Sequence, residues 1–207
     1  MRVHQWNGTA WTPLGSSIPG ESAGDNSGYS VSTSGDGNTV AIGAHNNDGN
    51  GQDAGHVRIY NWNGSSWNQI GNDIDGEAAN DQSGHSVSLS SDGNTVAIGA
   101  PFNDGNVTDA GHVRIYNYNG SSWNQLGQDV DGEAAYDRSG GGTSVSLSGD
   151  GNTVAIGAYR NNGNGNRSGH VRIYNYNGNS WTQIGQDIDG EAINDESGSS
   201  VSLSSNG

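Results

Sequence analysis

The sequence predicts an all-β fold, a segment of a β-propeller built from four-stranded antiparallel blades. The order Gly-His-Val-Arg-Ile-Tyr at residues 55–60 returns at 111–116 and 169–174. Tryptophans mark the same point in successive units, at spacings of 56, 56 and 58 residues: Trp11, Trp67, Trp123 and Trp181. Between them, short alternating apolar runs are separated by Gly, Asn, Asp and Ser. Tandem repetition of such a unit is typical of propeller blades.

Each unit is expected to hold four strands, which we name A to D. Representative positions are 86–90 for strand A, 95–100 for B, 56–61 for C and 67–71 for D. The turn residues Asp92-Gly93-Asn94 separate A from B, and Asn63-Gly64 separates C from D. Gly and Asn tolerate the positive φ that tight hairpin turns require, so A–B and C–D are predicted to be hairpins.

The repeat divides the chain into about 3.7 repeats of about 56 residues, which form a single repeat domain over residues 1–207. We expect an incomplete blade at 1–29, blades at about 30–73, 86–129 and 144–187, and a lone strand at 199–204. Both ends fall inside a repeat. This predicts self-association or the remainder of a longer chain.

The core is expected to lie between the blades. In strand B, Val96 and Ile98 can fill one face of the sheet, while Ala97 and Gly99 leave room for the next sheet to approach. Individual blades therefore bury their faces against their neighbours rather than within themselves.

The composition excludes several classes of function. The chain has 22 acidic residues, seven arginines and no lysine, giving a formal net charge of -15, so it would repel nucleic acid. It has no cysteine, which excludes disulfides and thiolate metal sites. Its apolar stretches are far shorter than the roughly 20 residues of a membrane helix, so no membrane insertion is expected. The first residues show no signal peptide pattern.

The repeat resembles the FG-GAP repeats of integrin-α-type propellers. The resemblance rests on Gly99-Ala100-Pro101, on Gly111-His112-Val113 and on the order of the strands around them. It implies an extracellular or cell-surface module for adhesion or recognition, with a protein or carbohydrate ligand. Family members often carry a calcium loop between strands A and B. Here the turn Ser91-Asp92-Gly93-Asn94 is too short to wrap an ion, so that site is not carried over.

Most carboxylates are predicted to share one edge of the fold. Strands of alternating direction place the D–A and B–C loops at one edge and the two hairpin turns at the other. The D–A loops hold 15 acidic residues and the B–C loops four, out of 22. Only Asp36, Asp92 and Asp150 remain for the opposite edge. Long loops on a rigid scaffold are common binding surfaces, so the acidic edge is the predicted functional surface.

The D–A loops also contain the sharpest candidate for a metal site, the repeated order Asp-Ile/Val-Asp-Gly-Glu-Ala-x-x-Asp. Alternating carboxylates around a Gly turn suit a hard cation such as Ca²⁺. The same residues also fit a solubilising surface loop whose last Asp caps a turn, and both interpretations stay open. The candidate ligands are Asp73, Asp75, Glu77, Asp81, Asp129, Asp131, Glu133, Asp137, Asp187, Asp189, Glu191 and Asp195.

Other repeated polar and aromatic residues are assigned mainly structural roles. The loops at 47–53 and 103–109 are predicted to form Asx turns without metal, because the third copy at 161–167 lacks both aspartates. Aromatic residues after strand C favour packing over a sugar-binding platform. The repeated histidines favour packing or a cross-strand hydrogen bond, and the repeated arginines are expected to pair with a carboxylate or lie across a tyrosine. These positions are His56, His112, His170, Arg58, Arg114 and Arg172.

The sequence contains no nucleophile elbow, zincin motif, P-loop or dinucleotide fingerprint, and we expect no enzyme activity. The leading hypothesis is a non-catalytic extracellular adhesion or recognition module that uses its acidic loop edge with or without Ca²⁺. The alternative is a purely structural, self-assembling repeat scaffold. A more distant alternative is an enzyme like a glycoside hydrolase, which would use one pair of carboxylates.

Overall fold

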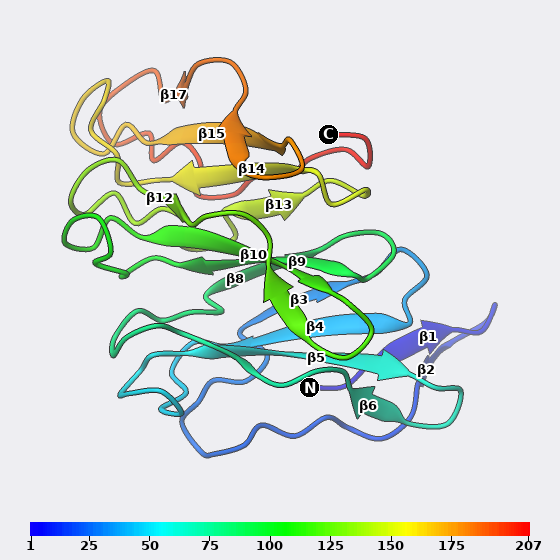
Figure 1. The fold of residues 1–207 in the computed structure, drawn as a ribbon. Coiled ribbons are helices and arrows are strands. Elements are labelled where there is room, and N and C mark those ends of the chain that lie inside the picture. Colours follow the sequence, from blue (N-terminus) through cyan, green and yellow to red (C-terminus); the bar gives the residue numbers. More distant parts are fainter.

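The computed structural model describes residues 1–207, which form strands, turns and loops without any helix. A two-stranded hairpin comes first, and three sheets follow it (Figure 1). The hairpin is β1 (His4–Trp6) with β2 (Trp11–Pro13). Without helices, the chain also has no helix that could span a membrane.

Each sheet contains the four antiparallel strands that the sequence predicts, in the order A-B-C-D. Blade 1 consists of β3 (Ser30–Thr33), β4 (Thr39–Ala44), β5 (His56–Trp62) and β6 (Trp67–Gln69). Blade 2 consists of β8 (Ser86–Leu89), β9 (Thr95–Ala100), β10 (His112–Tyr118) and β11 (Trp123–Gln125). Blade 3 consists of β13 (Val145–Leu147), β14 (Thr153–Ala158), β15 (His170–Tyr176) and β16 (Trp181–Gln183).

A fifth, two-residue strand completes each sheet, and the sequence did not indicate it. These strands are β7 (Ile74–Asp75), β12 (Val130–Asp131) and β17 (Ile188–Asp189). Strand C has seven residues and strand D only three, so strand D covers only the far end of strand C. In blade 1, β7 pairs with the uncovered beginning of β5, where Asp75 faces His56 and Ile74 faces Val57.

Residues 199–204, for which a lone strand is expected, form no strand. Ser200 makes one isolated bridge to Thr143, and the amide of Val201 donates to the carbonyl of Thr143. In the blades, strand A is held by a ladder to the following strand B, as Val87 is to Ile98. Residues 199–204 have no such ladder to a strand B in the structure.

The hydrophobic core lies between the blades, as predicted. One cluster joins Val57 and Ile59 of blade 1 to Val96 and Ile98 of blade 2, and a second joins blades 2 and 3 in the same way. A shared hydrogen bond reinforces each junction. At the first of them, Nε1 of Trp123 donates to the carbonyl of Ile70 at 2.9 Å. The sheets therefore act as a stack rather than as independent units.

Glycine permits the closest approach between neighbouring blades. A Cβ atom on Gly99 of β9 would collide with the carbonyl oxygen of Gly140, which leads into blade 3. Gly43 and Gly157 occupy the same position in the other blades and meet the carbonyls of Gly84 and Gly198. This confirms the expected role of glycine in strand B, because any side chain there would push the sheets apart.

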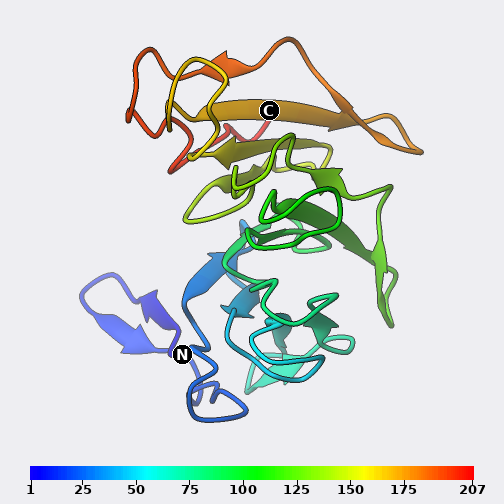
Figure 2. The same cartoon turned by 90° about the vertical axis from the view of Figure 1, so that its left-hand side faces the viewer.

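The three blades form an open stack that does not close into a ring. Figure 2 shows the blue hairpin of residues 1–13 beside blade 1, while blade 3 and the C-terminus lie at the opposite end. The A strands run side by side along the stack. They are linked by serines, since Ser32 Oγ accepts from the amide of Leu89 and Ser88 Oγ accepts from that of Leu147, both at 2.9 Å.

Candidate functional site

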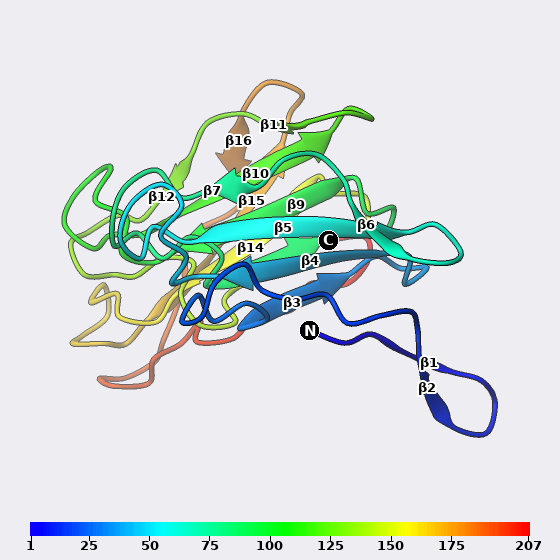
Figure 3. The ribbon, with the colours of Figure 1, turned by 90° about the horizontal axis from the view of Figure 1, so that it is seen from below.

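The D–A and B–C loops lie at one edge of the stack, where the sequence places the carboxylates. The side chain of Asn50 in a B–C loop donates to the carbonyl of Gly76 in the following D–A loop at 2.7 Å, and the amide of Asn80 donates to the carbonyl of Gln52. In Figure 3 these long loops gather at the end of the strands where β7 and β12 lie. We call this region the acidic edge.

The carboxylates of one D–A motif point to different places. Asp73 approaches His56 of its own blade, and its Oδ2 lies 3.6 Å from the imidazole Nδ1. Glu77 approaches the next blade, where its Oε2 lies 3.9 Å from Nδ1 of His112. Asp75 sits in β7 with an exposed side chain. Three groups of carboxylate and imidazole side chains bring their ligand atoms within 4.8 Å of one another. In each group the two carboxylates come from different D–A loops.

In two of the three copies of the motif, the last aspartate serves as a buried turn cap, whereas Asp195 of the third copy is exposed. Asp81 is 3% exposed, and its Oδ2 accepts from the amide of Ala78 at 3.0 Å and from Nδ2 of Asn103 at 2.9 Å. Asp137 repeats these contacts with Ala134 and Asn161. The turn-capping interpretation therefore describes these aspartates.

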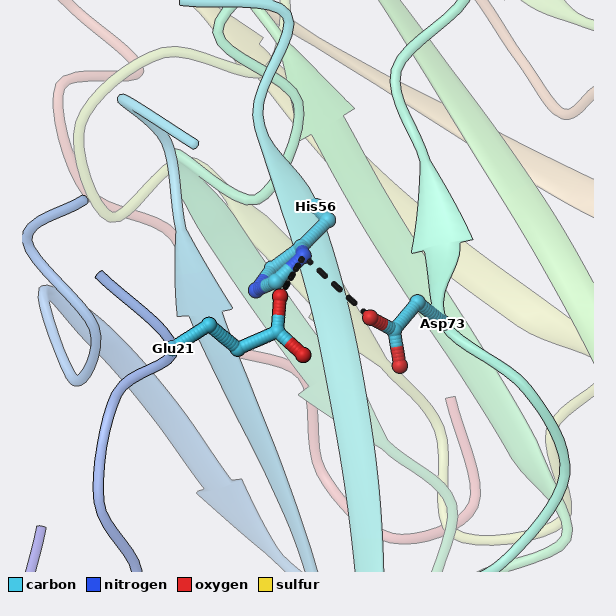
Figure 4. Close-up of side chains that lie close together, drawn as sticks. All are labelled: Glu21, His56 and Asp73. Atoms are coloured by element: carbon cyan, nitrogen blue, oxygen red, sulfur yellow. Dashed lines mark ion pairs between the residues drawn. The ribbon is translucent and has the colours of Figure 1, made fainter. Parts of the chain in front are cut away.

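The structure instead assembles three clusters, each made of one glutamate, one histidine and one aspartate. They are Glu21, His56 and Asp73, then Glu77, His112 and Asp129, then Glu133, His170 and Asp187. Figure 4 shows the first of them, with both carboxylates directed at the same nitrogen of the imidazole. These three clusters could hold a metal ion. Five of the twelve predicted ligands take part, and Asp75, Asp131, Glu191 and the others do not.

Local structure explains how each cluster forms. The histidine is the first residue of strand C and is fixed by the ladders on both sides of that strand. The short strand β7 pairs with this residue. Asp73 directly precedes β7 and is thereby placed beside His56. The glutamate belongs to the D–A loop that precedes the blade, so only the stacking of blades places it there.

In every cluster each carboxylate has one oxygen held by a neighbour and the other oxygen near the imidazole. In blade 2, Oε1 of Glu77 lies 3.3 Å from Nη1 of Arg114, while Oδ1 of Asp129 accepts from Nε2 of Gln125. The remaining oxygens, Oε2 and Oδ2, lie 3.9 and 3.8 Å from Nδ1 of His112. The same division recurs at the other two clusters.

The arginine beside each cluster behaves as predicted. Nη2 of Arg114 donates to the carbonyl of Asp75 at 2.7 Å, and the guanidinium lies over the ring of Tyr116 at 5.6 Å from its centroid. Arg58 and Arg172 make the corresponding contacts. The guanidinium of Arg114 thus holds both the backbone of the D–A loop at Asp75 and the side chain of Glu77.

The imidazoles are neutral near pH 7. Burial, followed by the positive charge of Arg114, lowers the pKa of His112 to about 4, although Asp129 opposes both effects. Burial is also the main cause of the lowered pKa of His56 and His170. A neutral imidazole carries one unprotonated nitrogen, which can act as a ligand without first losing a proton.

Sequence reasoning assigned these histidines to packing and did not connect them with the acids. A signal was present, however. His112 follows Glu77 by 35 residues and precedes Asp129 by 17, and these spacings recur as 35 and 17 at His56 and as 37 and 17 at His170. The relation was hidden because the glutamate and the aspartate belong to two different D–A loops.

The remaining candidates have the structural roles that the sequence favoured. The loop at 47–53 forms an Asx turn in which Asp48 Oδ1 accepts from the amide of Asp53 at 2.8 Å. The aromatic residues pack, since the rings of Trp62 and Trp67 lie 5.5 Å apart and Nε1 of Trp67 donates to Leu14 of the preceding segment. A groove of about 660 Å³ also runs along the A strands, where Tyr29, His85 and Val145 line it.

Comparison with known proteins finds a family match for two of the repeats and a structure with a similar fold. The FG-GAP repeat family matches residues 19–60 and 74–116. A putative 6-phosphogluconolactonase from Bacteroides uniformis is similar over 79% of this chain and 41% of its own, with 13% identity and a TM-score of 0.52. Comparison with curated proteins finds no match.

Two β-propeller domains are also similar in structure. The β-propeller domain of Cps50 (Swd1) from Myceliophteria thermophila is 12% identical, with a TM-score of 0.43 over 77% of this chain and 43% of its own. That of the Trilobed protease from Pyrococcus furiosus is 12% identical, with a TM-score of 0.45 over 77% and 41%. The chain spans about two fifths of these structures, and the likenesses concern the fold alone.

Proposed function

We propose, since the chain carries FG-GAP repeats, that it is a non-catalytic adhesion or recognition module that acts outside the cell or at its surface. The observation that carries this proposal is the concentration of carboxylates at one edge of a rigid stack. The loops at this edge hold 19 carboxylates, whereas the hairpin edge holds only 3, and the net charge of the chain is -15. Such a surface attracts a ligand with complementary positive charge. A protein with a basic patch fits best, and a carbohydrate held through a cation is the second form of ligand.

Ca²⁺ is the cofactor that we propose for this edge. The aspartates of β7, β12 and β17 are exposed there and are not part of the Glu–His–Asp clusters. Their oxygens suit a hard cation, and loop carbonyls and water would complete its coordination. An ion at this position would also offer open coordination sites to the oxygens of a ligand.

The proposal is tested by binding measurements on immobilised chain with a panel of extracellular matrix proteins and a glycan array, each with Ca²⁺ and with chelator. One triple variant removes three charges from the acidic edge, Asp75→Asn, Asp131→Asn and Asp189→Asn. A matched triple variant removes three from the hairpin edge, Asp36→Asn, Asp92→Asn and Asp150→Asn. We expect the first to weaken binding at least tenfold and the second to leave it within about twofold. Equal losses, or no binding partner on either panel, would reject the proposal.

A structural, self-assembling role is the second candidate, and the exposed face of blade 3 favours it. Ile184 and Ile188 are 50% and 54% exposed. The equivalent residues of blade 2, Leu126 and Val130, pack against blade 3. An apolar face of this kind favours association. Light scattering distinguishes the recognition role from the scaffold role. If the chain is a monomer at about 1 mg/ml and still binds its ligand, the self-assembling role is excluded.

A further inference from the structure

We infer that each Glu–His–Asp cluster is a binding site for a divalent metal ion that takes mixed nitrogen and oxygen ligands, and that Zn²⁺ is the ion that fits best. The chain would then bind three ions, one beside the first residue of each strand C. This inference is separate from the proposed recognition role, because the clusters and the exposed aspartates of the acidic edge are different residues.

The first argument is that the donor atoms are already oriented. A carboxylate that binds a metal usually has its second oxygen hydrogen-bonded, which fixes its direction. Here Arg114 holds Oε1 of Glu77 and Gln125 holds Oδ1 of Asp129, while the other oxygens face the imidazole. The same arrangement occurs three times with three sets of residues.

The second argument is a buried nitrogen without a partner. The side chain of His112 is 1% exposed, and its Nδ1 has no hydrogen-bond partner although it is directed between two carboxylates. At His56 and His170 the buried nitrogen without a partner is Nε2, so this argument applies to the second cluster alone. Both distances exceed the 2.7–3.2 Å typical of a hydrogen bond. A polar atom buried without a partner is costly, so it needs a physical explanation. A metal ion between the three side chains would satisfy it.

The third argument concerns size. With bonds of about 2.0–2.2 Å, tetrahedral Zn²⁺ holds neighbouring ligand atoms about 3.3 Å apart. In the three clusters Nδ1 lies 3.5–4.0 Å from the facing oxygens. Shifts of roughly 0.2–0.7 Å would close this gap between nitrogen and oxygen. The carboxylates can make them, since the aspartates are 27–31% and the glutamates 44–45% exposed. The exposed side would admit the ion and a water molecule as fourth ligand.

The ligand types decide between metals. Ca²⁺ takes six to eight oxygen ligands at 2.3–2.6 Å, whereas each cluster supplies only two carboxylates and one imidazole. Imidazole suits Zn²⁺, Cu²⁺ and Ni²⁺, whose affinity for such sites exceeds that of Mn²⁺ or Mg²⁺. We therefore expect Zn²⁺ to be selected over Ca²⁺.

The position of the cluster gives the ion a structural effect. Glu77 precedes blade 2, whereas His112 and Asp129 belong to the strands and loop of that blade. An ion at this site would join the loop of one blade to the sheet of the next. Since a metal that binds only the folded chain stabilises it by mass action, Zn²⁺ should raise the melting temperature.

The test is a calorimetric titration of the metal-free chain with ZnCl₂ in the presence of millimolar Ca²⁺, repeated with Co²⁺ while its visible absorption is recorded. We expect three ions per chain and the intense absorption of four-coordinate Co²⁺. The variant His112→Gln should bind two ions and retain its circular dichroism. The control Asp131→Asn changes an exposed acid of the same loop and should still bind three. If His112→Gln does not fold, Asp129→Asn replaces it, because that side chain is partly exposed.

Three results would overturn the inference. The first is an unchanged count of three ions in both His112→Gln and Asp129→Asn. The second is the absence of saturable Zn²⁺ binding below about 0.1 mM. The third is complete displacement of Zn²⁺ by an equal concentration of Ca²⁺. A loss of one ion in Asp131→Asn would instead place the metal within a single loop and would equally reject the clusters as the site.

Discussion

Glu77 and His112 come from opposite sides of the junction between blades 1 and 2, and Oε2 of the glutamate lies 3.9 Å from Nδ1 of the histidine. The same junction contains the apolar cluster of Val57, Ile59 and Val96. The polar cluster is therefore positioned by blade packing, and its geometry depends on how closely the two sheets approach. Changes that loosen a junction should weaken the site beside it.

The junction between blades 2 and 3 should depend strongly on Ile115. This residue is fully buried in the cluster that joins the two blades. Ile115→Ala removes three carbons from that core and should lower the free energy of unfolding by about 2–5 kcal/mol. Ile173 holds the same repeat position in blade 3, where its face is only partly covered. The control Ile173→Ala should cost less than half as much in urea denaturation, and equal costs would show that the core does not lie between blades.

Gly99→Ala should be among the most damaging small substitutions. The new methyl group would meet the backbone carbonyl of Gly140, which cannot move without separating blades 2 and 3. We expect a loss of at least about 2 kcal/mol, typical of overpacking against rigid backbone. In the control Gly163→Ala the new methyl group meets side-chain atoms alone, Oδ1 of Asn161 at 3.0 Å and Oδ1 of Asp189 at 3.6 Å. Thermal melts of the two variants should differ clearly, and matching midpoints would contradict the close approach.

The sequence predicts the blades well because their signals are local. Hairpin turns such as Asn63-Gly64 and the alternating strand residues act within a few positions, so the order A-B-C-D follows directly. The short strand β7 escaped prediction because two residues carry no periodicity. Its pairing depends on the unequal lengths of β5 and β6, which only the assembled sheet reveals.

The candidate site was predicted less completely, for a related reason. The acidic motif was read as a local loop, whereas Asp73 and Glu77 diverge to two different histidines. Contacts across blades join residues that are far apart in the chain, and a single sequence shows them only through the repeat. The arginines were easier to assign, because Arg114 pairs with Glu77 and lies over Tyr116, two positions after it in the same strand.

Calcium should stabilise the chain if the exposed aspartates of the acidic edge bind it. An ion at a concentration one hundred times its dissociation constant adds about 2.7 kcal/mol to the free energy of unfolding. We therefore expect the melting temperature to rise in millimolar Ca²⁺ relative to chelator, and the triple change Asp75→Asn, Asp131→Asn and Asp189→Asn to abolish the rise. Mg²⁺ is the control for general charge screening. Identical midpoints in Ca²⁺, Mg²⁺ and chelator would leave these acids as surface charge.

The stability of the fold should decrease between pH 6.5 and pH 4, in part because of His85. Its Nδ1 accepts a hydrogen bond from the amide of Gly142 at 3.0 Å, so the bond needs an unprotonated nitrogen. Burial, followed by the nearby His45, lowers the pKa of His85 from 6.5 to about 4. The unfolded chain therefore binds more protons in this window. The stabilisation is complete above pH 6.5 and is lost as the pH falls toward 4.

Urea denaturation between pH 7 and pH 4.5 measures this loss, which should be roughly 1–3 kcal/mol because the ring is only partly buried. The variant His85→Gln keeps an acceptor for the amide of Gly142 but cannot titrate, so its stability should depend less steeply on pH. The other buried histidines keep some slope in the variant, since burial also lowers the pKa of His45 and His56. A hydrogen bond from Ser34 lowers the pKa of Asp36. The protonation of this carboxylate therefore affects stability only below this pH range. Equal slopes for the two proteins would show that His85 does not link protonation to folding.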